Sequence, residues 1–144
     1  MSYDTNNIFA KILRGEAPCT KVYEDEHTLA FMDIMPQCDG HVLVIPKEAA
    51  ETLMTLSPAG GHAALDTARK IARAAQKALA APGIYIAQMN GAAAGQTVPH
   101  FHIHVIPRHA QQAPRAHAAV MADPQALEAV AVKLRAALDL PDSI

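Results

Sequence analysis

The chain has 144 residues, of which 51% are hydrophobic and 4% aromatic, and its formal net charge is −2. This length suits one domain with a buried core, so we expect a single domain over residues 1–144. The small negative charge argues against a nucleic-acid partner, and no apolar run approaches the roughly 18 residues that span a bilayer. Two separated cysteines and a polar N-terminus favour a soluble cytoplasmic protein with reduced thiols.

Turn and capping residues divide the chain into short strands and four helices. Asn6 or Asn7 is expected to cap a short first helix that ends at Gly15, and Ser57 before Pro58 begins a long helix. Apolar and β-branched runs between polar turns predict the strands. Strands are expected over residues 21–24, 28–33, 41–45, 84–89 and 99–106, and the other helices over 48–53 and from Asp123-Pro124 onward.

The order of these elements predicts the α+β class. Strands joined by hairpins, with one long helix among them, favour an antiparallel sheet of about five strands. The long helix is expected to end near residues 82–83, and its apolar stripe either packs on the sheet or forms a dimer seam. That stripe consists of Leu65, Ala68, Ala72, Ala75 and Leu79.

Three histidines, His100, His102 and His104, alternate with apolar residues in one predicted strand. Side chains at alternate positions of a strand point to one face, so the three imidazoles would line up while Phe101 and Ile103 face the core. A single histidine in such a position is commonly a solvent-facing residue. Three on one face repel one another when charged, so the pattern indicates a functional site.

Two kinds of site use histidines in this way. Alternating histidines can bind zinc, and imidazole can also act as a nucleophile or transfer protons near neutral pH. The residues before the strand favour the second kind. Gly95 lets the backbone approach an anion closely, and Asn90, Gln96 and Thr97 supply neutral hydrogen-bond donors. A zinc site would be expected to have Cys, Asp or Glu close in sequence, so we expect phosphate chemistry and no metal.

The segment over residues 95–105 resembles the signature of the histidine triad (HIT) family, His-x-His-x-His followed by apolar residues. The resemblance covers about residues 5–110, the expected core, and leaves 111–144 outside it as a C-terminal connector and helix. It implies the HIT-like fold and a homodimer formed through the long helix and strand 84–89. Further matching segments are the opening helix over 7–12 and two strands over 31–34 and 40–47.

The resemblance also implies a role for each matching residue. His102 would be the nucleophile that takes up a nucleoside monophosphate as a covalent nucleotidyl-imidazole, and His104 would bind phosphate oxygens. His100 and His41 would orient His102 and pass protons. The nucleotide contacts would be Asp33 at the ribose, Ile8, Phe9 and Ile34 around the base, and Asn90, Gly95, Gln96 and Thr97 at the phosphate.

The activity that the resemblance implies is hydrolysis of a purine nucleotide without a cofactor, by cleavage of a phosphoramidate or a phosphoanhydride. Asp33 and Ile34 resemble the HINT branch of the family, whereas Pro107-Arg108 resembles the Fhit-like branch of dinucleoside polyphosphate hydrolases. The alternatives are therefore a dinucleoside polyphosphate hydrolase and a nucleotide-binding regulatory protein with little turnover. Some bacterial members hold a structural zinc with two cysteines near the first helix, but Asn7 and Ala10 stand there, so no zinc is expected.

Overall fold

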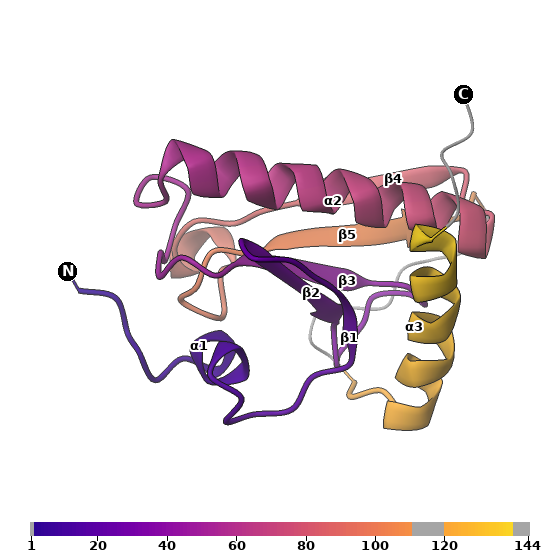
Figure 1. Cartoon of the computed structure of the whole chain (residues 1–144), viewed down its shortest axis with the longest axis horizontal. Coiled ribbons are helices and arrows are strands. Elements are labelled where there is room, and N and C mark those ends of the chain that lie inside the picture. Colours follow the sequence, from indigo (N-terminus) through magenta and orange to yellow (C-terminus); the bar gives the residue numbers. More distant parts are fainter. Residues whose placement is uncertain (1, 111–119, 140–144) are drawn as a thin grey trace.

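The computed structural model describes residues 2–110 and 120–139 and contains one antiparallel sheet with helices on both sides (Figure 1). Its five strands lie in the order β1-β2-β3-β5-β4. This arrangement confirms the α+β class and the antiparallel sheet predicted from the sequence. The strands are β1 (Lys21–Glu24), β2 (Thr28–Met32), β3 (Val42–Pro46), β4 (Gly83–Ala87) and β5 (Ile103–Arg108).

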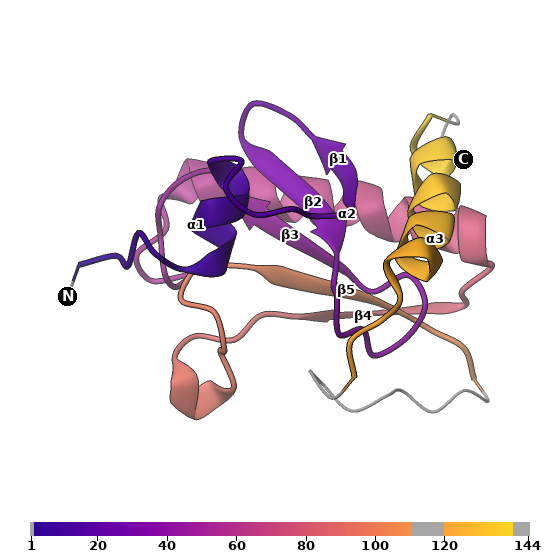
Figure 2. The ribbon, with the colours of Figure 1, turned by 90° about the horizontal axis from the view of Figure 1, so that it is seen from below.

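The helices cover different parts of this sheet. The long helix α2 lies along one side, and α1 lies on the opposite side (Figure 1). Turned by 90°, the molecule shows α1 and the loop after β4 at one end of the sheet and α3 at the other (Figure 2). None of the described helices is long and apolar enough to cross a bilayer. The helices are α1 (Ile8–Leu13), α2 (Pro58–Leu79), the 3-10 turn η1 (Ala92–Ala94) and α3 (Pro124–Leu138).

Side-chain caps begin the helices where the sequence predicts them. Asn7, rather than Asn6, caps α1, because its Oδ1 accepts the N–H of Ala10 at 2.9 Å. Ser57 caps α2 in the same way, with its Oγ accepting the N–H of Gly60 at 3.0 Å. Each cap of this type stabilises a helix by about 1 kcal/mol. The cap of α1 also fixes where the N-terminal segment approaches the sheet.

Strand alternation gives the sheet two buried faces. One face packs against α2 and α3 through Ala30, Met32, Val42, Val44, Ile103 and Val105. The other face packs against Phe9 of α1 through Leu29, Phe31, Leu43 and Ile45. Positions 33, 41, 102 and 104 follow the alternation of this second face. The candidate site residues therefore lie on the side of the sheet that α1 partly covers.

Two predicted elements differ most from the structure. The helix expected over residues 48–53 is wrong: the segment forms bends and turns, because the Glu48 carboxylate accepts from Ser57 and the Leu53 N–H donates to Asn90. The strand expected over 99–106 begins later, at Ile103, since the Phe101 N–H donates to Ala50 outside the sheet. The expected connector over residues 111–117 lies outside the described residues.

The predicted apolar stripe of α2 is also partly wrong. Leu65 is 61% exposed, while Ala68 and Ala75 are buried as expected. The face that packs on the sheet is turned toward Ala64 and Ile71 and away from Leu65. It is built mainly from small side chains, which allow the helix to approach the sheet closely. Its buried members are Ala64, Thr67, Ala68, Ile71, Ala74 and Ala75.

Candidate active site

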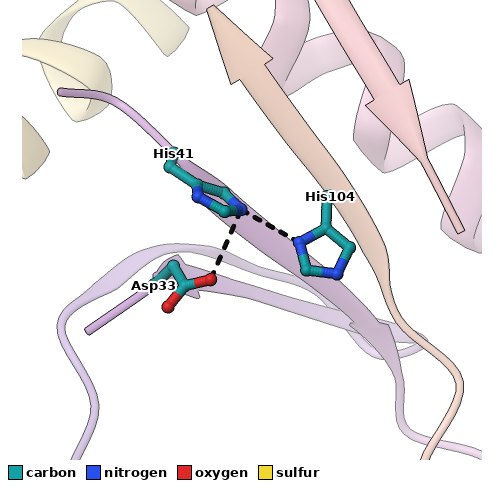
Figure 3. A group of neighbouring side chains, drawn as sticks. All are labelled: Asp33, His41 and His104. Atoms are coloured by element: carbon teal, nitrogen blue, oxygen red, sulfur yellow. Dashed lines mark hydrogen bonds and ion pairs between the residues drawn. The ribbon is translucent and has the colours of Figure 1, made fainter. Parts of the chain in front are cut away.

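A buried cluster of Asp33, His41 and His104 joins three neighbouring segments of the sheet (Figure 3). The β3–β5 register pairs Leu43 with His104, which makes His41 the diagonal neighbour of His104 on the same face. His41 Nε2 lies 2.9 Å from His104 Nδ1 and 3.3 Å from Asp33 Oδ2. Asp33 follows β2 directly, and its N–H donates to the carbonyl of His41 at 3.0 Å.

Backbone donors fix the direction of these hydrogen bonds. The Gln37 N–H donates to His41 Nδ1 at 3.0 Å, so that nitrogen carries the lone pair and the ring proton lies on Nε2. The Nε2–H then donates to His104 Nδ1 and faces the Asp33 carboxylate. This places the proton of neutral His104 on its own Nε2. The cluster is thus a directed chain of donors from His41 to His104.

The ligand atoms of the same three side chains lie within 4.8 Å of one another, close enough to contact a single metal ion. A metal requires the lone pair of a deprotonated nitrogen. His41 would have to offer Nε2, but the Gln37 N–H occupies the lone pair of Nδ1 and leaves the proton on Nε2. The cluster fits a hydrogen-bonded relay better than a set of metal ligands.

His102 and His100 form a second group beside this relay. His102 Nδ1 donates to the carbonyl of His100 at 2.7 Å, so its lone pair lies on Nε2. His100 Nε2 donates to the carbonyl of Pro46 at 2.8 Å. The pKa of His100 lies below its ordinary value, and burial is the main cause. The hydrogen bond to the Pro46 carbonyl raises this pKa by a smaller amount, and the nearby His102 lowers it further. His100 is therefore neutral at physiological pH. The rings of His102 and His104 lie 5.0 Å apart between centroids, so the two groups are in contact.

A cavity of about 520 Å³ opens between α1 and this face of the sheet. Its volume lies within the usual range for small-molecule sites. Ile8 and Ile34, which are 46% and 50% exposed, line it together with buried Phe9. Apolar walls with a few convergent polar groups are typical of a small-molecule binding site. The polar groups at this cavity are Asp33, Thr97, His102 and His104.

The structure brings most of the predicted site residues together. Seven of them line the cavity: Ile8, Phe9, Asp33, Ile34, Thr97, His102 and His104. His41 and His100 are fully buried and contact the lining histidines through the hydrogen bonds above. Cys19 also lines the cavity, although no pattern in the sequence marked it as a site residue.

Three predicted phosphate contacts instead build the loop beside the cavity. The side-chain oxygen of Gln96 accepts the Gly91 N–H at 2.6 Å. Its Nε2 donates to the carbonyls of Glu51 and Val98 at 2.8 and 3.0 Å. Asn90 accepts the Leu53 N–H at 2.8 Å. The N–H groups of Gly95 and Gln96 both donate within the loop, to Ala92 and Gly91. Phosphate contacts by Asn90, Gly95 and Gln96 therefore stay predictions.

Comparison with known proteins identifies the class to which this site belongs. A family model described as the HIT domain matches residues 14–111. The chain therefore belongs to the HIT domain family, which its sequence resembles. A crystal structure of a HIT-like protein from Bartonella henselae is 44% identical, with a TM-score of 0.90, and the match covers 95% of this chain and 99% of that one.

Two relatives carry names that describe an activity. Adenosine 5'-monophosphoramidase hnt1 of Schizosaccharomyces pombe is 41% identical over 101 residues, which are 70% of this chain and 73% of that protein. Adenylylsulfatase HINT3 of Arabidopsis thaliana is 43% identical over 101 residues, which are 70% of this chain and 51% of that protein.

Proposed function

We propose that this chain is a nucleotide hydrolase that releases a purine nucleoside monophosphate from a phosphoramidate through a covalent bond to His102. The observation that carries this proposal is the hydrogen bond from His102 Nδ1 to the His100 carbonyl, which leaves the Nε2 lone pair at the cavity. Two relatives named for action on adenylyl compounds support the substrate class.

The reaction proceeds in two displacements at phosphorus. In the first, His102 Nε2 forms a bond to phosphorus while the bond to the leaving amine breaks, and the amine departs after taking up a proton from the solvent. In the second, water attacks the same phosphorus and gives up a proton to the solvent, the bond to Nε2 breaks, and the nucleoside monophosphate leaves with the imidazole restored. Two steps through a covalent intermediate each have a lower barrier than one direct displacement.

His104 and His41 stabilise the negative charge that develops on phosphate oxygens. The Nε2–H of His104 is the donor for a phosphate oxygen, and its Nδ1 is held by the Nε2–H of His41. Asp33 Oδ2 lies 3.3 Å from His41 Nε2, so its carboxylate favours positive charge on the two imidazoles of the relay. Donors that are already oriented before the reaction lower the barrier without reorganising during it.

The nucleoside part occupies the apolar part of the cavity. Ile8, Phe9 and Ile34 form the walls against which a purine packs, and Asp33 accepts hydrogen bonds from the ribose hydroxyls. Thr97 lies at the edge of the loop and supplies a hydroxyl near the leaving group. No cofactor takes part in these steps.

A substrate panel tests this proposal. We expect the wild-type chain to hydrolyse an adenosine phosphoramidate with a higher kcat/KM than a diadenosine polyphosphate, as followed by chromatography of released AMP. A clearly higher kcat/KM for the diadenosine polyphosphate would instead assign the chain to dinucleoside polyphosphate hydrolysis. Tight nucleotide binding with turnover of neither compound would favour a nucleotide-binding regulatory protein.

We also propose that the active form is a homodimer. Strand β4 lies at the edge of the sheet and exposes Tyr85 and Ile86, which are 50% and 44% exposed. Two hollows of about 490 and 530 Å³ share His62, Leu65 and Ile86 between α2 and this edge. An uncovered sheet edge beside an apolar patch is typical of a surface that binds another chain.

A further inference from the structure

A polar contact joins the start of the chain to the first histidine of the triad. Tyr3 Oη lies 2.5 Å from His100 Nδ1, although the two residues are 97 positions apart in sequence. The two rings meet edge to face with centroids 5.6 Å apart. Tyr3 precedes the residues that the HIT domain model matches, which begin at residue 14. The contact therefore comes from a part of this chain that the family match does not include.

The direction of this hydrogen bond follows from its neighbours. The Pro46 carbonyl can only accept, so the His100 ring proton lies on Nε2 and its Nδ1 carries the lone pair. Tyr3 must then donate its hydroxyl proton to Nδ1.

The helix cap holds Tyr3 in this role. Asn7 Oδ1 accepts the Ala10 N–H, which turns its amide nitrogen toward Tyr3 Oη at 2.8 Å. The hydroxyl oxygen of Tyr3 therefore accepts from Asn7 and its proton remains directed at His100.

The contact reaches the nucleophile in one further step. His100 is fully buried, and its carbonyl is the acceptor that holds His102 Nδ1 at 2.7 Å. Phe9 adds a second link, since its ring lies 5.0 Å from that of His102 between centroids. Asn7 and Phe9 both belong to the start of α1, so the segment that carries Tyr3 is fixed against the same two histidines.

We propose that Tyr3 is a positioning residue: by donating to His100 Nδ1, it fixes the buried imidazole and the carbonyl that orient His102 for attack. The proposal rests on the proposed function in so far as His102 is the nucleophile. Without the Tyr3 hydroxyl, His100 has a buried acceptor lacking its donor, and the ring can rotate or take the other tautomer. The substrate cavity itself does not include Tyr3. The loss should therefore affect the chemical step more than binding.

The variant Tyr3→Phe tests this proposal, with Tyr23→Phe as the matched control. Tyr23 also carries a hydrogen-bonded hydroxyl, donating to Asp25 at 2.9 Å, but it lies on β1 away from the cavity. We expect Tyr3→Phe to lower kcat for an adenosine phosphoramidate about threefold to tenfold, the effect of losing one neutral hydrogen bond, with KM within about twofold. Tyr23→Phe should keep both constants.

Nitrogen NMR of the histidine rings gives a readout that does not depend on turnover. In the wild type, His100 should be in the Nε2–H form, with a Tyr3 hydroxyl proton that shows a cross-peak to the ring. In Tyr3→Phe the His100 Nδ1 signal should move, whereas in Tyr23→Phe it should stay. An Nδ1–H form in the wild type, unchanged kcat in Tyr3→Phe, or a rise in KM alone would overturn the proposal. A wild type without turnover would contradict the proposed function, while the NMR arm would still decide whether Tyr3 holds His100.

Discussion

The variant His102→Ala is expected to lose at least about 10⁴-fold in kcat for an adenosine phosphoramidate, a loss seen when an enzyme's nucleophile is removed. The substitution deletes the only protein atom proposed to bond to phosphorus, so that water must displace the amine directly. Nucleotide binding should change little, because the apolar walls formed by Ile8, Phe9 and Ile34 remain. Single-turnover kinetics and calorimetric titration with AMP measure the two quantities separately.

A matched control for this experiment is His27→Ala. His27 is an exposed histidine in the turn before β2, and its ring lies 3.2 Å from Glu26 rather than at the cavity. The control should therefore keep wild-type kcat and KM. If His102→Ala retained more than a tenth of wild-type turnover while folded, His102 would not be the nucleophile.

The second large effect is expected at the proposed dimer surface. Replacing Ile86 by lysine places an ammonium group on the apolar patch between β4 and α2, where a partner chain would remove it from water. Burying a charge without a partner costs several kcal/mol, so the dimer dissociation constant should rise at least about 100-fold. Sedimentation velocity over a range of protein concentrations measures this change.

The variant Val132→Lys is the control for the dimer experiment. Val132 is 52% exposed, but it lies on α3 and lines neither of the two hollows beside β4. This variant should sediment as the wild type does. A wild type that stays monomeric at all concentrations, or an Ile86→Lys variant as dimeric as the wild type, would show that this surface is not the interface.

Local patterns in the sequence predicted the parts of the fold that depend on neighbouring residues. The caps at Asn7 and Ser57 and the buried strand after His41 each have a local cause, in a side-chain acceptor or in an apolar run. The alternation of histidines with Phe101 and Ile103 also gave the correct faces, because Phe101 and Ile103 join the core while His102 and His104 line the cavity.

The features that the sequence did not predict depend on contacts between distant segments. The exposed Leu65 shows that helical spacing alone does not decide which of two adjacent stripes of α2 faces the sheet. The relay from His41 to His104 required the β3–β5 register, which brings residues 63 positions apart to 2.9 Å. The contact of Tyr3 with His100 gave no signal, since a single tyrosine before a helix has no periodicity.

A covalent bond between phosphorus and His102 is the central step of the proposed reaction. The stereochemical course of hydrolysis tests it directly, with a nucleoside phosphorothioate substrate that is chiral at phosphorus and isotopically labelled water. Each in-line displacement inverts the configuration, so attack by His102 Nε2 followed by attack of water predicts net retention. Net inversion would show a single direct attack by water and would contradict the account.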